Sequence, residues 1–297
     1  MKFLDLFSGI GGFRLGLECA GHEPVGWVEI DKFARKSYQA MYDTTDEWTA
    51  TDINKVTDEK WREFNGTVEL IAGGFPCQSF SIAGKREGFL NKTKGTLFFE
   101  IARAVKQIKP RFVFLENVKG LLNHDKGNTF RTILNTFDEL GYDVQWRVLN
   151  SKDFGVPQNR ERVYIIGHLR GDSGREVFSS FGEDGSVNQA NVKQIGNISN
   201  SNSFGGNPQI GRVYSDDGLS PTLNTMQGGG REPKVYLERR IRKLTPRECW
   251  RLQAFPDELF DKAQQAGLSD SQLYKQAGNS VTVNVIEYIG KMIERGY

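Results

Sequence analysis

The chain contains few cysteines and histidines, almost no net charge and no long apolar run, and each absence excludes a class of protein. Its three cysteines, Cys19, Cys77 and Cys249, lie far apart, which excludes a disulfide framework and indicates a reducing compartment. The three histidines are scattered and form no metal-ligand spacing with the cysteines. We therefore expect neither structural disulfides nor a bound metal ion.

Hydrophobic residues make up 38% of the chain and charged residues 26%, as in a soluble globular protein. No apolar run approaches the ~20 residues that span a bilayer, so we expect no membrane segment. The opening residues, Met1–Asp5, lack the layout of a signal peptide, which indicates a cytoplasmic protein. The net charge of +2 neither requires nor excludes a polyanionic partner, so any basic groove must be produced by folding. With 297 residues the chain can form one large domain or two of ordinary size.

Strand-like and helix-like segments alternate through the first part of the chain. Strands are predicted for six short apolar runs: Lys2–Phe7, Val25–Ile30, Val68–Ala72, Phe112–Glu116, Tyr142–Leu149 and Val163–Gly167. Helices are predicted from the first glycine-rich turn to about Ala20, and for three segments with apolar residues at helical spacing: Asp31–Tyr42, Leu97–Ile108 and Thr129–Leu140. This alternation is typical of an α/β fold with a mostly parallel sheet covered by helices on both faces.

The alternation ends after about Leu169. The segment Gly185–Gly211 is rich in Gly, Asn and Ser, which is typical either of a disordered linker or of a recognition surface built from loops. A helix begins again at Pro246, with Thr245 as its N-cap. A last helix over Thr282–Glu294 is expected to pack back on the sheet.

A glycine-rich turn, Ser8–Gly12, follows the first strand and opens a helix, where glycines let a ligand approach the backbone. Glu29 ends the next strand about 20 residues on, where an acid can bond ribose hydroxyls. Asp52, after the following turn, could bond an adenine amino group. The pattern is Gly-x-Gly-Gly, not the dinucleotide Gly-x-Gly-x-x-Gly, which favours S-adenosylmethionine over NAD. A tight turn without a ligand is the alternative.

Cys77 follows the predicted strand Val68–Ala72, at the sheet edge where open α/β proteins bind their ligands. Pro76 fixes one backbone dihedral next to the thiol and so limits where it can point. A lone cysteine can equally be buried and inert. The glycine pair before it and the polar residues after it, within Gly73–Ser81, favour a binding site over a packed core.

Three further polar clusters lie at strand ends or in the turns beside them: Glu116–Val118, Gln158–Arg162 and Gln276–Val281. Taken singly, Glu116 could be a capping acid and the arginines a solvated ion-pair cluster. Together, a Cys, a Glu and an Arg at neighbouring strand ends suggest covalent catalysis on an electron-poor ring.

In their residues and their order these segments resemble the DNA cytosine-5 methyltransferases of bacterial or phage type, especially the small restriction-modification enzymes. The resemblance covers Lys2–Gly167 and Arg212–Ile293. The matching motifs are Asp5–Phe13, Gly73–Ser81, Gly95–Ile101, Glu116–Val118, Gln158–Gly167, Arg242–Pro256 and Gln276–Val281. The resemblance implies an α/β fold with a Rossmann-like sheet of the S-adenosylmethionine-dependent methyltransferases, helices on both faces of that sheet, and a smaller target-recognition domain.

The resemblance also implies the layout and the reaction. Residues 1–170 and 277–297 would form the catalytic, cofactor-binding domain, and 171–276 the target-recognition domain and hinge. The enzyme would methylate carbon 5 of cytosine within a specific short double-stranded DNA sequence. The enzyme, prokaryotic or phage-encoded, would act in the cytoplasm, associated with the nucleoid and separate from any cognate restriction endonuclease. The recognised sequence cannot be derived from these residues.

By the family's motifs, Cys77 would be the nucleophile that adds to carbon 6 of the base. Glu116 would contact N3 and the exocyclic amino group and give N3 a proton. Because an ordinary Glu titrates near ~4.3, burial should raise the pKa of Glu116. Arg162 would contact O2 and hold Glu116, with Arg160 as its partner in that network.

The resemblance assigns cofactor contacts to Phe7, Ser8, Gly9, Gly11, Gly12, Glu29, Ile30, Asp52, Ile53, Pro76, Leu97, Asn279 and Ser280. It assigns DNA contacts to Gln78, Ser81, Lys85, Arg86, Thr222 and Arg231. The loop Ile82–Asn91 would be the lid that closes over DNA once the target base is flipped out of the duplex. A plain surface loop is the alternative for that segment.

Three other functions carry different sequence features. An RNA (tRNA) cytosine-5 methyltransferase shares the chemistry, but those relatives carry other residues after the Pro-Cys pair. A catalytically silent DNA-binding regulator is disfavoured because Cys77, Glu116 and Arg162 are intact. An NAD oxidoreductase is disfavoured by the glycine pattern and by the lack of a hydride-transfer site.

Overall fold

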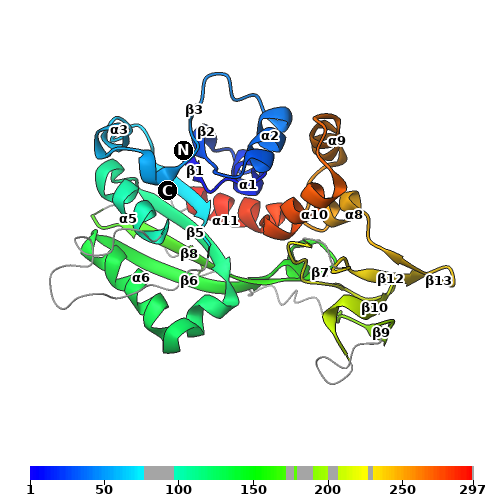
Figure 1. Cartoon of the computed structure of the whole chain (residues 1–297). Helices are drawn as coiled ribbons and strands as arrows, with labels where there is room; N and C mark the ends of the chain where they lie inside the picture. The colour runs from blue at the N-terminus through cyan, green and yellow to red at the C-terminus, as the bar shows by residue number, and fades with distance from the viewer. Residues whose placement is uncertain (77–96, 172–176, 179–189, 200–206, 227–229, 296–297) are drawn as a thin grey trace.

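The structure, a computed structural model, describes residues 1–76, 97–171, 177–178, 190–199, 207–226 and 230–295 (Figure 1). Within these residues the chain forms a seven-stranded sheet, a four-stranded sheet and a two-stranded ladder. Figure 1 shows helices on both sides of the large sheet and the four-stranded sheet set apart at the lower right. Of the helices in the described ranges, none combines the length and the apolar character that crossing a membrane requires.

The large sheet has the strand order β3-β2-β1-β4-β5-β8-β6. Its strands are β1 (Lys2–Leu6), β2 (Glu23–Val28), β3 (Trp48–Ala50), β4 (Leu70–Gly74), β5 (Phe112–Val118), β6 (Tyr142–Asn150) and β8 (Glu161–Leu169). Neighbouring strands are parallel, except that β8 is antiparallel to both β5 and β6. The strand order reverses between β1 and β4, which is where open α/β sheets form a ligand crevice. The predicted mostly parallel sheet is confirmed, and β3 is a strand that the sequence did not predict.

Every helix for which both ends were predicted is present, and each end lies within one residue of the expected position. The α-helices of the described chain are α1 (Gly12–Cys19), α2 (Lys32–Met41), α3 (Asp58–Arg62), α5 (Leu97–Ile108), α6 (Asn128–Glu139), α8 (Pro246–Arg251), α9 (Asp257–Gln265), α10 (Asp270–Asn279) and α11 (Val283–Arg295). Short 3-10 turns lie at η1 (Ile53–Lys55), η2 (Lys119–Gly127), η3 (Ser151–Phe154) and η4 (Gln209–Gly211). Thr245 is the N-cap of α8, as predicted, and the structure adds a capping box with Glu248.

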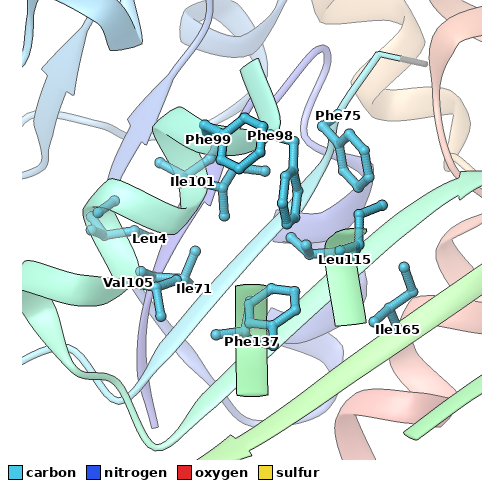
Figure 2. Packing of buried hydrophobic residues seen from close by; sticks show 14 of the residues in the cluster. Leu4, Ile71, Phe75, Phe98, Phe99, Ile101, Val105, Leu115, Phe137 and Ile165 are labelled. Atoms are coloured by element: carbon cyan, nitrogen blue, oxygen red, sulfur yellow. The ribbon is translucent and has the colours of Figure 1, made fainter. Parts of the chain in front are cut away.

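One face of the large sheet is covered by α5 and α6. Figure 2 shows how their side chains meet alternate residues of the strands, with Phe98 lying between Phe99 and Phe75. The residues of this cluster that Figure 2 labels are Leu4, Ile71, Phe75, Phe98, Phe99, Ile101, Val105, Leu115, Phe137 and Ile165. Burying each such side chain contributes about 1.5–3 kcal/mol. This core therefore fixes the strand ends that carry the polar clusters.

The opposite face is covered by α1 and α11, so that the first and last helices of the chain lie side by side (Figure 1). Gly16 allows their close approach, because a Cβ at that position would lie 2.6 Å from Cβ of Ile286. The expectation that the last helix packs back on the sheet is confirmed. This return brings the segment before α11 to the same sheet edge as the glycine-rich turn.

The second sheet has the order β13-β12-β10-β9, and a separate ladder joins β7 to β11. These strands are β7 (Gln158–Asn159), β9 (Gln194–Asn197), β10 (Arg212–Ser215), β11 (Ser220–Pro221), β12 (Lys234–Leu237) and β13 (Arg240–Lys243). Since β9 pairs with β10, part of the Gly/Asn-rich segment Gly185–Gly211 is folded into a sheet. Helices α8, α9 and α10 form a third core with Met41 of α2 and Ile10 of the glycine-rich turn.

Candidate active site and cofactor cleft

A cleft of about 390 Å³ opens at the carboxyl ends of the central strands. A cavity of this size suits a small organic ligand. It is lined by eleven of the residues that the sequence assigned to catalysis or cofactor binding: Phe7, Gly9, Glu29, Ile30, Pro76, Leu97, Glu116, Arg160, Arg162, Asn279 and Ser280. These residues come from both ends of the chain, so the fold brings the separate polar clusters together as expected.

The glycine-rich turn is shaped by its packing as well as by its opening to the cleft. Gly9 has a φ of 55°, and a Cβ there would meet nothing within 4 Å, so its backbone is accessible from the cleft. Gly11 has a φ of 81°, and a Cβ there would lie 2.6 Å from the ring of Tyr42. A Cβ at Gly12 would lie 2.7 Å from the side chain of Val281. Thus Gly9 alone of these three leaves space for a ligand.

Two predicted cofactor residues of this turn differ in their environment. Phe7 lines the cleft with a φ of 57°, a strained conformation for a residue with a side chain. Ser8 is buried, and its hydroxyl has no hydrogen-bond partner within the described part of the chain.

Glu29 follows β2 and closes the cleft beside the glycine-rich turn. Its Oε2 accepts a hydrogen bond from the N–H of Gly9 at 2.8 Å, and its Oε1 accepts one from the N–H of Asp31 at 2.7 Å. Burial raises the pKa of Glu29, and these two hydrogen bonds act against that rise. The neighbouring Ile30 also lines the cleft and is 68% exposed, so its apolar side chain is accessible to a ligand. A carboxylate held next to an open apolar side chain suits the ribose and base of a nucleoside.

Asp52 and Ile53 lie apart from the described cleft lining. Asp52 caps η1, and its Oδ1 accepts hydrogen bonds from the backbone and the side chain of Asn54 at 3.0 and 2.8 Å. Ile53 is 3% exposed and belongs to the core beneath α5. Their cofactor contacts stay predictions.

Glu116 and Arg162 form an ion pair at the other end of the cleft. Glu116 lies on β5 opposite Gly74 of β4, and its Oε1 is 3.0 Å from Nε of Arg162. Burial raises the pKa of Glu116, while the charges of Arg162 and Arg160 lower it by a smaller amount. The expected direction of the shift is therefore confirmed, and a proton can remain on this carboxyl at a higher pH than on an ordinary Glu.

Asn117 is a positioning residue for which no separate role was predicted. It is 3% exposed, and its Nδ2 donates a hydrogen bond to the carbonyl of Phe75 at 2.8 Å. Its Oδ1 accepts the N–H of Val118 at 2.8 Å. The side chain therefore fixes the end of the segment that leads into Pro76 and Cys77. Its place between Glu116 and Val118 was the signal that could have indicated it.

Arg160 lines the cleft but binds main-chain atoms. Its guanidinium donates to the carbonyls of Leu223, Gly278 and Ser280 at 3.1, 3.1 and 2.7 Å. The sequence placed it in a network with Glu116 and Arg162, and the structure adds this set of carbonyls from elsewhere in the chain.

Lys275 and Gln276 are lining residues that the sequence did not assign. The ammonium of Lys275 lies 2.7 Å from Oδ2 of Asp31, the N-cap of α2. Gln276 accepts a hydrogen bond from the hydroxyl of Ser37 at 3.0 Å and donates one to the carbonyl of Phe33 at 3.1 Å. These contacts hold α10 against α2 and form one wall of the cleft.

The predicted DNA-contacting residues are described only in part. Cys77 lies outside the described residues, and so do four predicted DNA contacts: Gln78, Ser81, Lys85 and Arg86. Thr222 and Arg231 are both exposed. Thr222 donates a hydrogen bond from its hydroxyl to the carbonyl of Asn159 at 2.6 Å.

The doubly wound sheet, the glycine-rich turn and the acid after β2 define an α/β protein whose cleft at the carboxyl edge suits a nucleoside-type ligand. The family model of the C-5 cytosine-specific DNA methylases matches residues 1–202 and 182–295. The chain therefore belongs to the C-5 cytosine-specific DNA methylase family, as its motifs predicted, and the prediction of a DNA (cytosine-5) methyltransferase is confirmed at that level.

The curated relatives agree with this family. The orphan methyltransferase M.SPRI of Bacillus phage SPR is 33% identical over 439 residues, which cover 100% of this chain and 98% of the relative. The type II methyltransferase M.HhaI of Haemophilus parahaemolyticus is 37% identical over 317 residues, which cover 97% of this chain and 93% of the relative. Among solved structures, the Dnmt2 methyltransferase of S. pombe superposes with a TM-score of 0.72 over 99% of both chains at 20% identity, which shows that the fold is shared.

Proposed function

We propose that this protein methylates carbon 5 of cytosine within a specific short double-stranded DNA sequence, with S-adenosyl-L-methionine as the methyl donor. The observation that carries the proposal is the juxtaposition, in one cleft, of the buried Glu116–Arg162 pair with the carboxylate of Glu29. The Glu116–Arg162 pair suits a pyrimidine base, and the carboxylate of Glu29 suits a nucleoside cofactor.

The residues around Glu29 fit the cofactor. Glu29 would hold the ribose, Ile30 and Leu97 the base, and the backbone of Gly9 the amino-acid end. When bound, S-adenosylmethionine supplies an electrophilic methyl group. We propose further contacts from the other residues that the family's motifs indicate: Phe7, Ser8, Gly11, Gly12, Asp52, Ile53, Pro76, Asn279 and Ser280.

The target base would be flipped out of the duplex, because its ring cannot be reached inside the stack. The thiolate of Cys77 would add to carbon 6, which turns carbon 5 into a nucleophile. Glu116, whose pKa is raised by burial, would give its proton to N3 as this bond forms. Arg162 would hold Glu116 and contact O2. Carbon 5 would take the methyl group and leave S-adenosylhomocysteine. Loss of the carbon-5 proton to water then breaks the bond between carbon 6 and sulfur, the Cys77 thiolate leaves, and N3 returns its proton to Glu116, which restores the aromatic ring.

DNA would be held by both parts of the chain. We propose that Gln78, Ser81, Lys85 and Arg86 contact the duplex next to the flipped base. Exposed Thr222 and Arg231 would contact it from the recognition domain. Residues 1–170 and 277–297 would form the catalytic domain, and 171–276 the recognition domain and hinge. The enzyme would work in a prokaryotic cytoplasm, next to its DNA, with any restriction endonuclease acting separately.

The direct test is transfer of labelled methyl groups from S-adenosylmethionine to duplex DNA and to tRNA, followed by bisulfite mapping of the modified cytosines. We expect incorporation into duplex DNA at one recurrent short sequence. Incorporation into tRNA alone would establish the RNA methyltransferase instead, and incorporation into neither would indicate a silent DNA-binding protein. Cys77→Ala serves as the matched inactive control.

A further inference from the structure

The two residues of β7 bind the segment Ser220–Thr225, which is named here the recognition segment because it carries Thr222. β7 pairs in parallel with β11 at the start of this segment. The hydroxyl of Thr222 donates to the carbonyl of Asn159 at 2.6 Å. The side-chain oxygen of Gln158 accepts the N–H of Leu223 at 3.2 Å. The recognition segment is therefore fixed in register to the chain that enters β8.

Arg160, the next residue, extends this attachment to the cofactor cleft. One of its nitrogens, Nη1, donates to the carbonyl of Leu223 at 3.1 Å. The other, Nη2, donates to the carbonyls of Gly278 and Ser280 at 3.1 and 2.7 Å. The segment Gly278–Ser280, named here the cofactor turn, contributes all three of its residues to the cleft lining. One guanidinium thus joins the recognition segment to the wall of the cofactor cleft.

Direct backbone contact reinforces the same junction. A Cβ at Gly278 would lie 1.9 Å from the carbonyl oxygen of Asn224 and 2.9 Å from Cα of Thr225. Real Cβ atoms do not approach other atoms so closely, so only glycine allows the recognition segment to lie on the cofactor turn. A displacement of either segment must therefore move the other.

The choice of arginine at this position is informative. Arg160 is 2% exposed and its three hydrogen-bonding partners are neutral carbonyls, so desolvation of the charge is costly. A residue that only filled space could be apolar. A planar guanidinium presents donors in fixed directions, so it can bridge two backbone segments in a way that a lysine ammonium cannot.

We propose that Arg160 is a positioning residue that couples occupancy of the cofactor cleft to DNA recognition. Its link between the cofactor turn and the recognition segment makes each ligand favour the conformation that binds the other. This proposal rests on the function proposed above. It also gives Arg160 a role separate from that of Arg162, which binds Glu116.

The test measures the coupling itself. Calorimetry gives the Kd of S-adenosylhomocysteine, the reaction product, with and without a saturating duplex that carries the mapped methylation site. Couplings between sites are commonly 5- to 150-fold, and we expect the wild-type ratio to lie within about this range. In Arg160→Lys we expect the ratio to fall below about twofold. Because the ratio compares two Kd values of the same variant, a change in its Kd without DNA does not by itself alter the ratio. Arg170→Lys is the control, since Arg170 is an exposed arginine whose partners are Asp138 and Asp143.

Reciprocity provides an internal check, because the product must tighten DNA binding by the same factor as DNA tightens product binding. If Arg160→Lys does not fold, as judged by circular dichroism, Thr222→Val replaces it. That exposed substitution removes the bond to Asn159 and should lower the ratio at least about twofold. A wild-type ratio of one, or a variant ratio equal to that of the wild type, would overturn the proposal. DNA methylation by the wild type in that case would leave the proposed function intact.

Discussion

Replacing Glu29 by Gln tests the cofactor site with a minimal change of shape. The carboxylate of Glu29 accepts two backbone N–H groups, from Gly9 at 2.8 Å and from Asp31 at 2.7 Å. A Gln side chain has one acceptor oxygen, so one of these N–H groups would face an amide donor. A hydrogen bond to a charged group contributes about 1.5–3 kcal/mol. In the proposed complex the carboxylate also accepts from the ribose, and loss of one such charged bond to the cofactor corresponds to a roughly 10- to 100-fold weaker Kd, at about 1.4 kcal/mol for each factor of ten.

The assay is calorimetric titration with S-adenosylhomocysteine, with thermal unfolding of the ligand-free protein measured in parallel. Glu63→Gln is the matched control, because Glu63 is an exposed carboxylate whose partner is Lys60 at 2.6 Å. We expect the control to bind like the wild type and Glu29→Gln to lose affinity. Equal affinities for the two variants would refute the assignment of Glu29 to the cofactor and leave it only a structural role in the glycine-rich turn.

Four further substitutions test the remaining parts of the site. Cys77→Ala should abolish methyl transfer while the calorimetric Kd of S-adenosylhomocysteine stays within about twofold, because the thiol acts only on the base; appreciable turnover would contradict the covalent mechanism. Glu116→Gln should lower kcat by about 10²–10⁴-fold. Burial raises the pKa of Glu116, so the wild-type enzyme should lose rate as rising pH deprotonates this residue, and the variant should not show that loss. An unchanged pH profile would argue against Glu116 as the acid. Asn117→Ala should free the backbone at Phe75 and lower kcat up to about 100-fold without weakening product binding, a split that steady-state kinetics and calorimetry resolve. Gly11→Ala should lower the free energy of unfolding, measured in urea, by about 2–4 kcal/mol, because the new Cβ would meet Tyr42 and the positive φ is unfavourable for alanine. The control Gly66→Ala has a similar φ of 78° but open space around its Cβ, so it should lower the same free energy by only about 1–2 kcal/mol.

Glu29 could be predicted from the sequence because a strand-turn-helix-strand unit fixes the geometry between a glycine-rich turn and the next strand end. The same rule located Glu116 on the neighbouring strand, where register with β4 places it opposite Gly74. Spacing predicts the position of such residues, since regular structure converts sequence separation into position, while their roles came from the family resemblance. The alternation of elements predicted the mostly parallel sheet in the same way, but not the order of its strands.

Lys275 shows why other site residues could not be predicted. Its partner Asp31 lies 244 positions earlier in the chain, and their contact depends on how α10 packs against α2. Arg160 was identified by type, but its partners are main-chain carbonyls, which leave no signature in a sequence. The glycines of the turn illustrate the same limit, because ligand approach at Gly9 and close packing at Gly11 demand the same residue.

Gln158, Arg160 and Arg162 have three different partners, and the two-residue period of an extended chain places them on one side. Alternate side chains emerge on one face at intervals of ~7 Å, so Gln158, Arg160 and Arg162 follow one another along the same side. The first holds the recognition segment, the second joins it to the cofactor turn, and the third binds Glu116. A slip of one residue here would turn all three side chains away from the cleft. The ladder between β7 and β11 and the antiparallel pairing of β8 with β5 therefore set where the recognition segment lies relative to the Glu116–Arg162 pair.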